Sequence, residues 1–99
     1  RLRDAGLEPG LVIDCSHGNS GKEAARQAGV VDDLAQQIGS GQASIRGVMI
    51  ESNLVGGTQP LGPRAQLRYG QSVTDACLAL DATLPLLERL AAAVRAARP

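Results

Sequence analysis

The sequence predicts an α/β fold built on one β-α-β unit, and three observations support this. Two short apolar runs, at residues 11–15 and 45–51, each pass directly into polar residues. Parallel strands followed by ligand-binding loops have this pattern. Between the two runs, residues 23–37 place apolar side chains at helical spacing. A strand, a helix and a second strand joined by short links form a right-handed unit in nearly every known protein.

Each element of this unit has its own signal. The first strand, residues 11–15, is almost continuously apolar, which predicts burial on both faces of a parallel sheet. The helix ends at the glycines of residues 39–41. Its predicted buried face is Ala24, Ala28, Val31, Ala35 and Ile38.

The second half of the chain predicts a long connection and a final helix. Residues 52–71 are rich in glycine and proline and lack periodicity, and connections longer than ~15 residues tend to be functional. A helix is predicted over residues 82–97, with Asp81 as N-cap and Pro85 in the first turn, where its missing N–H costs nothing. Its predicted buried stripe is Leu84, Leu87, Ala91 and Val94.

Composition excludes several classes of protein. A chain of 99 residues suits one core, so we expect residues 1–99 to form a single segment. The net charge is zero and Tyr69 is the only aromatic residue, which argues against a nucleic-acid partner. We expect no membrane partner, because no apolar segment approaches ~20 residues. Two cysteines are too few for a disulfide scaffold, so a cytoplasmic location is expected.

Three polar residues are candidates for a metal site. His17, the only histidine, lies just past the first strand, and Glu51 ends the second. Neighbouring parallel strands lie about 4.8 Å apart, so their ends can hold one ion together, and Asp75 can join if the long connection folds back. A histidine with two carboxylates suits Mn, Fe, Zn or Co. The spacing matches no local metal motif, so on spacing alone a surface or capping histidine with solvated carboxylates is favoured over a metal site.

The loop at residues 16–22 permits two further interpretations. It resembles a phosphate cradle, since glycine-rich turns before a helix expose N–H groups to anions. Alternatively, Ser20 caps the helix and the residues after it form its first turn. Ser16 and His17, as neighbours on a strand, are predicted to point to opposite faces and not to pair. Cys15 is predicted to be a small buried hydrophobe.

Four sequence blocks occur together in a recognisable order. They are Asp-Cys-Ser-His-Gly-Asn-Ser-Gly-Lys at 14–22, Gly-Val-Met-Ile-Glu-Ser-Asn-Leu at 47–54, Gly-Thr-Gln at 57–59 and Tyr-Gly-Gln-Ser-Val-Thr-Asp-Ala-Cys at 69–77. Together they closely resemble the C-terminal part of class I 3-deoxy-D-arabino-heptulosonate 7-phosphate (DAHP) synthase, with compatible spacing over nearly the whole chain. Thr58 departs from the family, which usually has asparagine there.

This resemblance implies a fold and an activity. The family is a (β/α)8 barrel that condenses phosphoenolpyruvate with erythrose 4-phosphate, the first step of the shikimate pathway to the aromatic amino acids. It implies that residues 11–15 and 45–51 are the seventh and eighth barrel strands and that residues 82–97 are the closing helix. The expected fold class is therefore α/β, the C-terminal β-α-β-α portion of a TIM barrel. A homo-oligomer is expected for the full-length protein.

The resemblance also implies a ligand set. The family binds one divalent metal through a Cys, a His, a Glu and an Asp, and three of these carry over by motif to His17, Glu51 and Asp75. His17 and Asp75 are also the expected catalytic residues. The cysteine belongs to an earlier barrel strand, and neither Cys15 nor Cys77 matches its motif. We therefore expect a C-terminal fragment that is inactive alone. The alternative is a non-catalytic phosphate-binding or interaction module.

Overall fold

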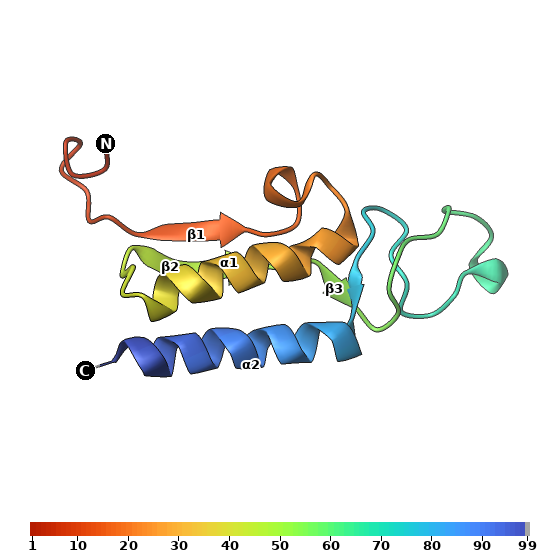
Figure 1. The fold of residues 1–99 in the computed structure, drawn as a ribbon. Helices are drawn as coiled ribbons and strands as arrows, with labels where there is room; N and C mark the ends of the chain where they lie inside the picture. The colour runs from red at the N-terminus through yellow and green to blue at the C-terminus, as the bar shows by residue number, and fades with distance from the viewer. Residues whose placement is uncertain (99) are drawn as a thin grey trace.

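Two parallel strand pairs and two helices form the regular structure of the computed structural model, which describes residues 1–98 (Figure 1). The molecule is elongated, with extents of 52 × 30 × 18 Å. The elements in chain order are β1 (Leu11–Asp14), α1 (Gln27–Gly39), β2 (Ile45–Met49), β3 (Ser52–Asn53), β4 (Leu78–Ala79) and α2 (Leu80–Ala97). Short 3₁₀ turns occur at Gly18–Ser20, Ala24–Arg26 and Arg64–Gln66.

Strands β1 and β2 pair in parallel, as predicted, and α1 connects them. The register places Asp14 opposite Met49. The pairing continues one residue further, where the Cys15 N–H donates to the Met49 carbonyl at 2.9 Å. The residues that follow both strands therefore emerge side by side at one edge.

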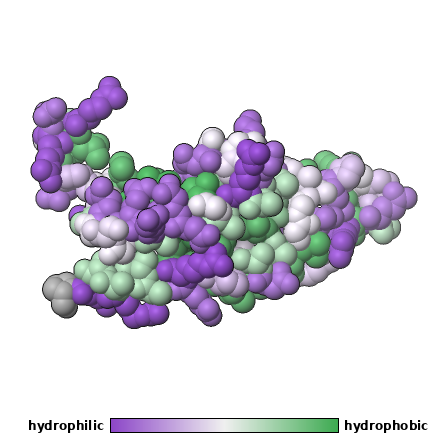
Figure 2. Space-filling model, in the orientation of Figure 1, coloured by the Kyte–Doolittle hydropathy of each residue, from purple (hydrophilic) through white to green (hydrophobic). Residues whose placement is uncertain are grey.

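The core is small and lies between the strand pair and the helices. Its buried residues are Cys15, Val31, Leu34 and Leu86, and strand side chains such as Ile13 and Val48 pack against them. The prediction that residues 11–15 are buried on both faces is wrong. The helices cover one face only, and Val12 is 70% exposed. Figure 2 shows apolar surface between polar residues along the molecule.

Helix α1 begins later than predicted. The helix was expected from residue 23, but residues 24–26 form a 3₁₀ turn and α1 starts at Gln27. The delay has a backbone cause, because Glu23 is extended, at φ −96° and ψ 117°, and therefore cannot be the first helical residue. Val31 is buried as predicted, whereas Leu34 and Gln27 are buried without having been predicted.

Helix α2 begins earlier than predicted. It starts at Leu80, so Asp81 lies inside the first turn and is not the N-cap. Ala79 holds that position and makes no side-chain capping bond. Pro85 consequently lies in the second turn, where it cannot donate to the carbonyl of Asp81, and the prediction that its missing N–H costs nothing is wrong. Neither helix in residues 1–98 combines the length and the apolar character that crossing a membrane requires.

The buried face of α2 also differs from the predicted stripe. Thr83 and Leu86 are buried, whereas Leu84 is 50% exposed and Leu87 is 48% exposed. Leucines occupy neighbouring lanes of this helix, so the apolar pattern alone does not fix which lane faces α1. The Thr83 hydroxyl lies 2.6 Å from the Ser52 hydroxyl, and this contact helps to set the rotation of the helix.

The long segment between β3 and β4 is held by hydrogen bonds. The side-chain amide of Gln59 donates to the carbonyls of Arg68 and Gln71, at 2.9 and 3.0 Å, and accepts the Arg68 N–H at 2.9 Å. The Thr58 hydroxyl donates to the Thr74 carbonyl at 2.6 Å. The prediction of a long connection is confirmed, although residues 52–53 form β3 and the connection extends beyond the predicted end at residue 71 to β4. Its return brings Asp75 back to the edge where β1 and β2 end.

Candidate metal centre

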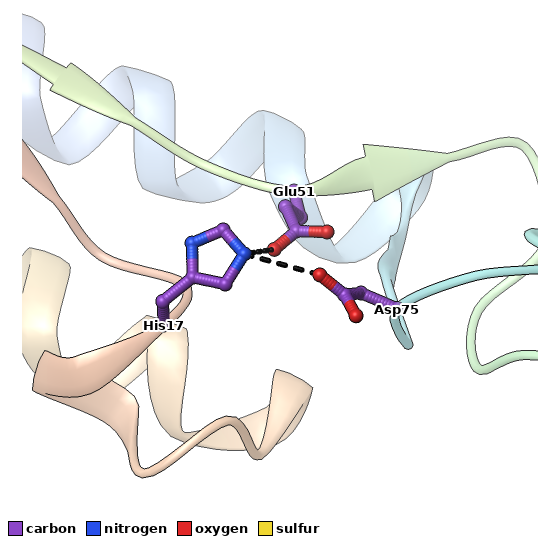
Figure 3. A group of neighbouring side chains, drawn as sticks. All are labelled: His17, Glu51 and Asp75. Carbon is purple, nitrogen blue, oxygen red and sulfur yellow. Dashed lines mark hydrogen bonds and ion pairs between the residues drawn. The ribbon is translucent and has the colours of Figure 1, made fainter.

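His17, Glu51 and Asp75 point toward one another at this edge (Figure 3). The His17 Nε2 atom lies 3.0 Å from Glu51 Oε1 and 3.1 Å from Asp75 Oδ2. One ligand atom from each residue lies within 4.8 Å of the other two. The structure therefore brings together the three residues singled out from sequence, although 58 positions separate His17 from Asp75.

Three separate segments deliver these side chains. His17 follows β1, and Glu51 lies in the link between β2 and β3. Asp75 stands three residues before β4, which pairs with β3. The side chains are 42%, 23% and 63% exposed, respectively, so Glu51 is the most enclosed and Asp75 the most accessible.

The distances from His17 to the two carboxylates are compatible with a shared divalent cation. Nitrogen and carboxylate ligands lie about 2.1 Å from such ions, so two ligands at a right angle are about 3.0 Å apart and two at a tetrahedral angle about 3.4 Å apart. The observed separations of 3.0 and 3.1 Å match a right-angled arrangement. A neutral imidazole and two carboxylates are also a donor set that suits borderline and hard divalent metals.

Asp14 fixes the orientation of the imidazole, and the sequence analysis missed this residue. Its Oδ2 lies 2.7 Å from His17 Nδ1, and its Oδ1 accepts the backbone N–H of Ser16 at 2.8 Å and also the Ser16 hydroxyl. A carboxylate that holds one imidazole nitrogen leaves the other free to bind a metal, as occurs at many metal-bound histidines. The sequence did contain a signal for this role of Asp14, namely a carboxylate at the end of a strand and three residues before the histidine.

Two pKa values at the site follow from these contacts. The hydrogen bonds from Ser16, together with that from His17, hold the pKa of Asp14 well below its usual range. The hydrogen bond to Asp14, and after it the one to Asp75, raises the pKa of His17. A His17 Nε2 that carries a proton can donate it toward the two carboxylates, whereas a deprotonated Nε2 would face them with a lone pair. A cation bound at this point would take the place of that proton.

The metal-free protein should therefore lose stability at alkaline pH. His17 has a raised pKa, so its contribution is full below its ordinary value of 6.5 and is lost as the pH rises through the raised value. Asp14 has a lowered pKa, so its contribution is present above 3.8 and is lost as the pH falls further. We expect the urea midpoint, measured with a chelator present, to be higher at about pH 5.5 than at about pH 8.5. The His17→Gln variant should lack this difference, and an unchanged difference in that variant would contradict the assignment to His17.

The residues next to His17 confirm one expectation and contradict another. Cys15 is fully buried in the core, as predicted, and burial raises the pKa of its thiol. Burial also raises the pKa of the Cys77 thiol. The prediction that Ser16 and His17 do not pair is wrong, since the Ser16 hydroxyl lies 3.1 Å from His17 Nδ1. The strand ends at Asp14, so the alternation of side chains no longer applies to these two residues.

The interpretation of Ser20 as a helix cap is also wrong. Its hydroxyl is buried and donates to the carbonyls of Ser16 and His17, while α1 begins seven residues later at Gln27. The backbone N–H groups of Gly21 and Lys22 donate to carbonyls within the same loop. These two N–H groups are therefore engaged within the loop and are not free for an anion.

The model of the DAHP synthetase I family matches residues 2–88. The chain belongs to the DAHP synthetase I family. This confirms the resemblance seen in the four sequence blocks.

Named members of the DAHP synthetase I family extend this result. A phospho-2-dehydro-3-deoxyheptonate aldolase of Corynebacterium glutamicum is 53% identical over 96 residues, which cover 89% of this chain and 26% of that protein. A tyrosine-inhibited phospho-2-dehydro-3-deoxyheptonate aldolase of Schizosaccharomyces pombe is 48% identical over 101 residues, which cover 98% of this chain and 27% of that protein. A structure of the Francisella tularensis aldolase superposes with a TM-score of 0.93 at 46% identity, covering 99% of this chain and 28% of that one. The chain thus spans about a quarter of the length of its relatives.

Proposed function

We propose that this chain supplies most of the metal-binding edge of a DAHP synthase. The reaction would join phosphoenolpyruvate to erythrose 4-phosphate, add one water at the former enol carbon and release phosphate. The observation that carries the proposal is the convergence of His17, Glu51 and Asp75, with one ligand atom from each within 4.8 Å of the others. Membership of the DAHP synthetase I family supports the choice of reaction.

We also infer the place of this chain in the complete enzyme. Strands β1 and β2 would be the seventh and eighth strands of a (β/α)8 barrel, with α2 as its closing helix and residues 1–99 as one segment of that domain. Active sites of such barrels lie at the carboxyl ends of the strands, and His17 and Glu51 follow the carboxyl ends of β1 and β2. The exposed outer face of β1, including Val12, is consistent with further strands and side chains packing there.

Each residue of the site would have a defined role. His17 Nε2, Glu51 Oε1 and Asp75 Oδ2 would hold a divalent cation, and Asp14 would keep a proton on His17 Nδ1. The cation would act as a Lewis acid on the aldehyde oxygen of erythrose 4-phosphate. Asp75, the most exposed of the three carboxylate or imidazole groups, would be the one able to exchange a proton with a bound substrate. Its attachment to the hydrogen-bonded long segment would keep this carboxylate in place.

A chimeric enzyme tests the proposal. The segment of the Corynebacterium glutamicum relative that matches this chain would be replaced by residues 1–99, which are 53% identical to it over the aligned length. We expect the purified chimera to form DAHP from the two substrates in a manner that a chelator abolishes and Mn²⁺ restores. A folded chimera with no activity under any metal condition would contradict the proposed function.

The 99-residue chain alone should bind Mn²⁺ weakly and form no DAHP. It offers three ligands, whereas the resemblance implies a fourth, a cysteine, from a part of the enzyme that these residues do not match. Calorimetry with Mn²⁺ and an assay with both substrates would check this expectation. Turnover by the isolated chain would show that residues 1–99 contain a complete site.

A further inference from the structure

We propose that Gln27 is a positioning residue that fixes the main chain of Glu51 and thereby aims the Glu51 carboxylate at His17. The inference rests on the proposed function in so far as Glu51 is a metal ligand. The protection of the Glu51 backbone amide can be measured without any metal. The positioning role of Gln27 and the proposed function can therefore fail separately.

The side-chain amide of Gln27 makes a two-point contact with the Glu51 backbone. Its Oε1 accepts the Glu51 N–H at 2.9 Å, and its Nε2 donates to the Glu51 carbonyl at 3.1 Å. A carboxamide has the same donor and acceptor as a peptide group, so Gln27 contacts Glu51 as a residue of a neighbouring strand would. Both hydrogen-bonding groups of the Glu51 backbone are engaged by one side chain.

Glu51 lies where the regular strand pairing is interrupted. Strand β2 ends at Met49 and β3 begins at Ser52, so Glu51 belongs to neither strand. Its carbonyl also accepts the N–H of Leu78, the first residue of β4, at 3.0 Å. Gln27 and Leu78 thus fix the Glu51 backbone from two sides, at a point that lies outside both strands.

Fixing this backbone has a direct effect on the site. The direction of the Cα–Cβ bond of Glu51 is set by its main chain, and its carboxylate is the most enclosed of the three ligand groups. Metal sites require ligands held to within about 0.5 Å, and the groups that orient ligands matter nearly as much as the ligands themselves. Leu78 follows Asp75 by three residues, so the same contact point also restrains the return of the long segment.

The burial of Gln27 indicates that the amide is there for these contacts. The residue is fully buried and occupies the first position of α1, beside the apolar core residue Val31. A buried amide is costly unless every polar atom has a partner, so an apolar side chain would be the simpler choice for filling this space. In Gln27 both polar groups are satisfied, and both by the same metal-ligand candidate.

The test compares three variants of the 99-residue chain. Gln27→Met removes the two hydrogen bonds while keeping the length of the side chain. Val31→Ala, on the same helix and equally buried, weakens the core without touching Glu51. Gln37→Met changes an exposed glutamine of α1 in the same way. Amide hydrogen exchange of Glu51 is measured by NMR on this chain without metal. Mn²⁺ affinity is measured by calorimetry on the chimeric enzyme carrying the same substitutions, because the 99-residue chain alone is expected to bind Mn²⁺ weakly.

We expect the Glu51 amide to exchange at least about 10-fold faster in Gln27→Met than in the other two variants. The comparison is made under conditions in which all three variants have the same free energy of unfolding. Mn²⁺ affinity should fall about 10- to 100-fold in Gln27→Met and stay within about twofold in the controls. An unchanged Glu51 exchange rate, or an equal increase in Val31→Ala, would overturn the positioning role. If Gln27→Met does not fold, Gln27→Glu keeps the acceptor for the Glu51 N–H and replaces the donor to its carbonyl. Wild-type exchange and wild-type Mn²⁺ affinity in that variant would likewise overturn the proposal.

The proposed function would fail differently. Its failure would appear as a wild-type chimera with no metal-dependent activity, whereas the exchange rate of the Glu51 amide would still report on Gln27. Loss of protection at Glu51 in Gln27→Met would then support the positioning of this backbone even without a metal at the site.

Discussion

Replacing His17 with alanine in the chimera should lower both Mn²⁺ affinity and DAHP formation by at least about 100-fold. Loss of a residue that merely orients a ligand costs about 10- to 100-fold, and loss of the ligand itself should cost more. His17 is the donor common to both short contacts of the site, at 3.0 Å to Glu51 and 3.1 Å to Asp75. Its removal also leaves the Asp14 carboxylate without its imidazole partner.

The effect should be confined to the site. His17 is 42% exposed, so the truncation opens no large cavity, and the thermal midpoint of the chimera should change little. Gln37→Ala, an exposed change on α1, serves as the control and should leave both Mn²⁺ affinity and turnover unchanged. Retention of metal-dependent activity by the His17→Ala chimera would remove His17 from the ligand set.

The second large effect is expected for Gly70→Ala in the long segment. Gly70 has φ +77°, and a Cβ added there would lie 2.7 Å from the Leu54 Cβ and 3.1 Å from its Cδ1. A left-handed backbone costs a non-glycine residue about 1–2 kcal/mol, and overpacking adds about 1–3 kcal/mol. We expect urea denaturation of the 99-residue chain to show a loss of about 2–4 kcal/mol. The Gly70 carbonyl also accepts the Val55 N–H at 2.9 Å, so the segment that carries Asp75 should shift.

Two further glycine variants separate the cost of the left-handed backbone from the cost of the contact with Leu54. Gly6→Ala places a residue at φ +76° where nothing lies within 4 Å, so it measures the backbone cost alone. Gly62→Ala has neither a positive φ nor a close neighbour and should be neutral. A Gly70→Ala variant no less stable than Gly6→Ala would show that Leu54 moves aside without cost.

The β-α-β unit could be predicted because its signals are local. The apolar run before Asp14 and the one before Glu51 each indicated a strand, and the spacing of residues between them indicated the helix. The choice of which residues are buried depends on packing between helices and could not be predicted from local sequence. Helix α2 has leucines in adjacent lanes, so the choice of Leu86 over Leu84 and Leu87 as the buried residue required the position of α1.

In the candidate site, too, some residues could be predicted from local sequence and others could not. His17 follows one predicted strand and Glu51 ends the other, and strand pairing brings strand ends together. Asp75 could be named only on the condition that the long connection folds back, and the resemblance to a family assigned it as a ligand, because nothing in its local sequence states where that segment returns. Asp14 and Gln27 were missed, since each acts through a contact with a polar group of another residue.

The sequence by itself determined the α/β class, the parallel pair of strands, the buried state of Cys15 and the family to which the chain belongs. These features depend on residue type, periodicity and motifs, which are present in the linear order. Only the tertiary structure decided that α1 and α2 cover one face of the strands, that Thr83 and Leu86 form the buried lane of α2, and that Gln27 contacts Glu51. Those features depend on contacts between segments far apart in the chain, and their geometry exists only once the segments have packed.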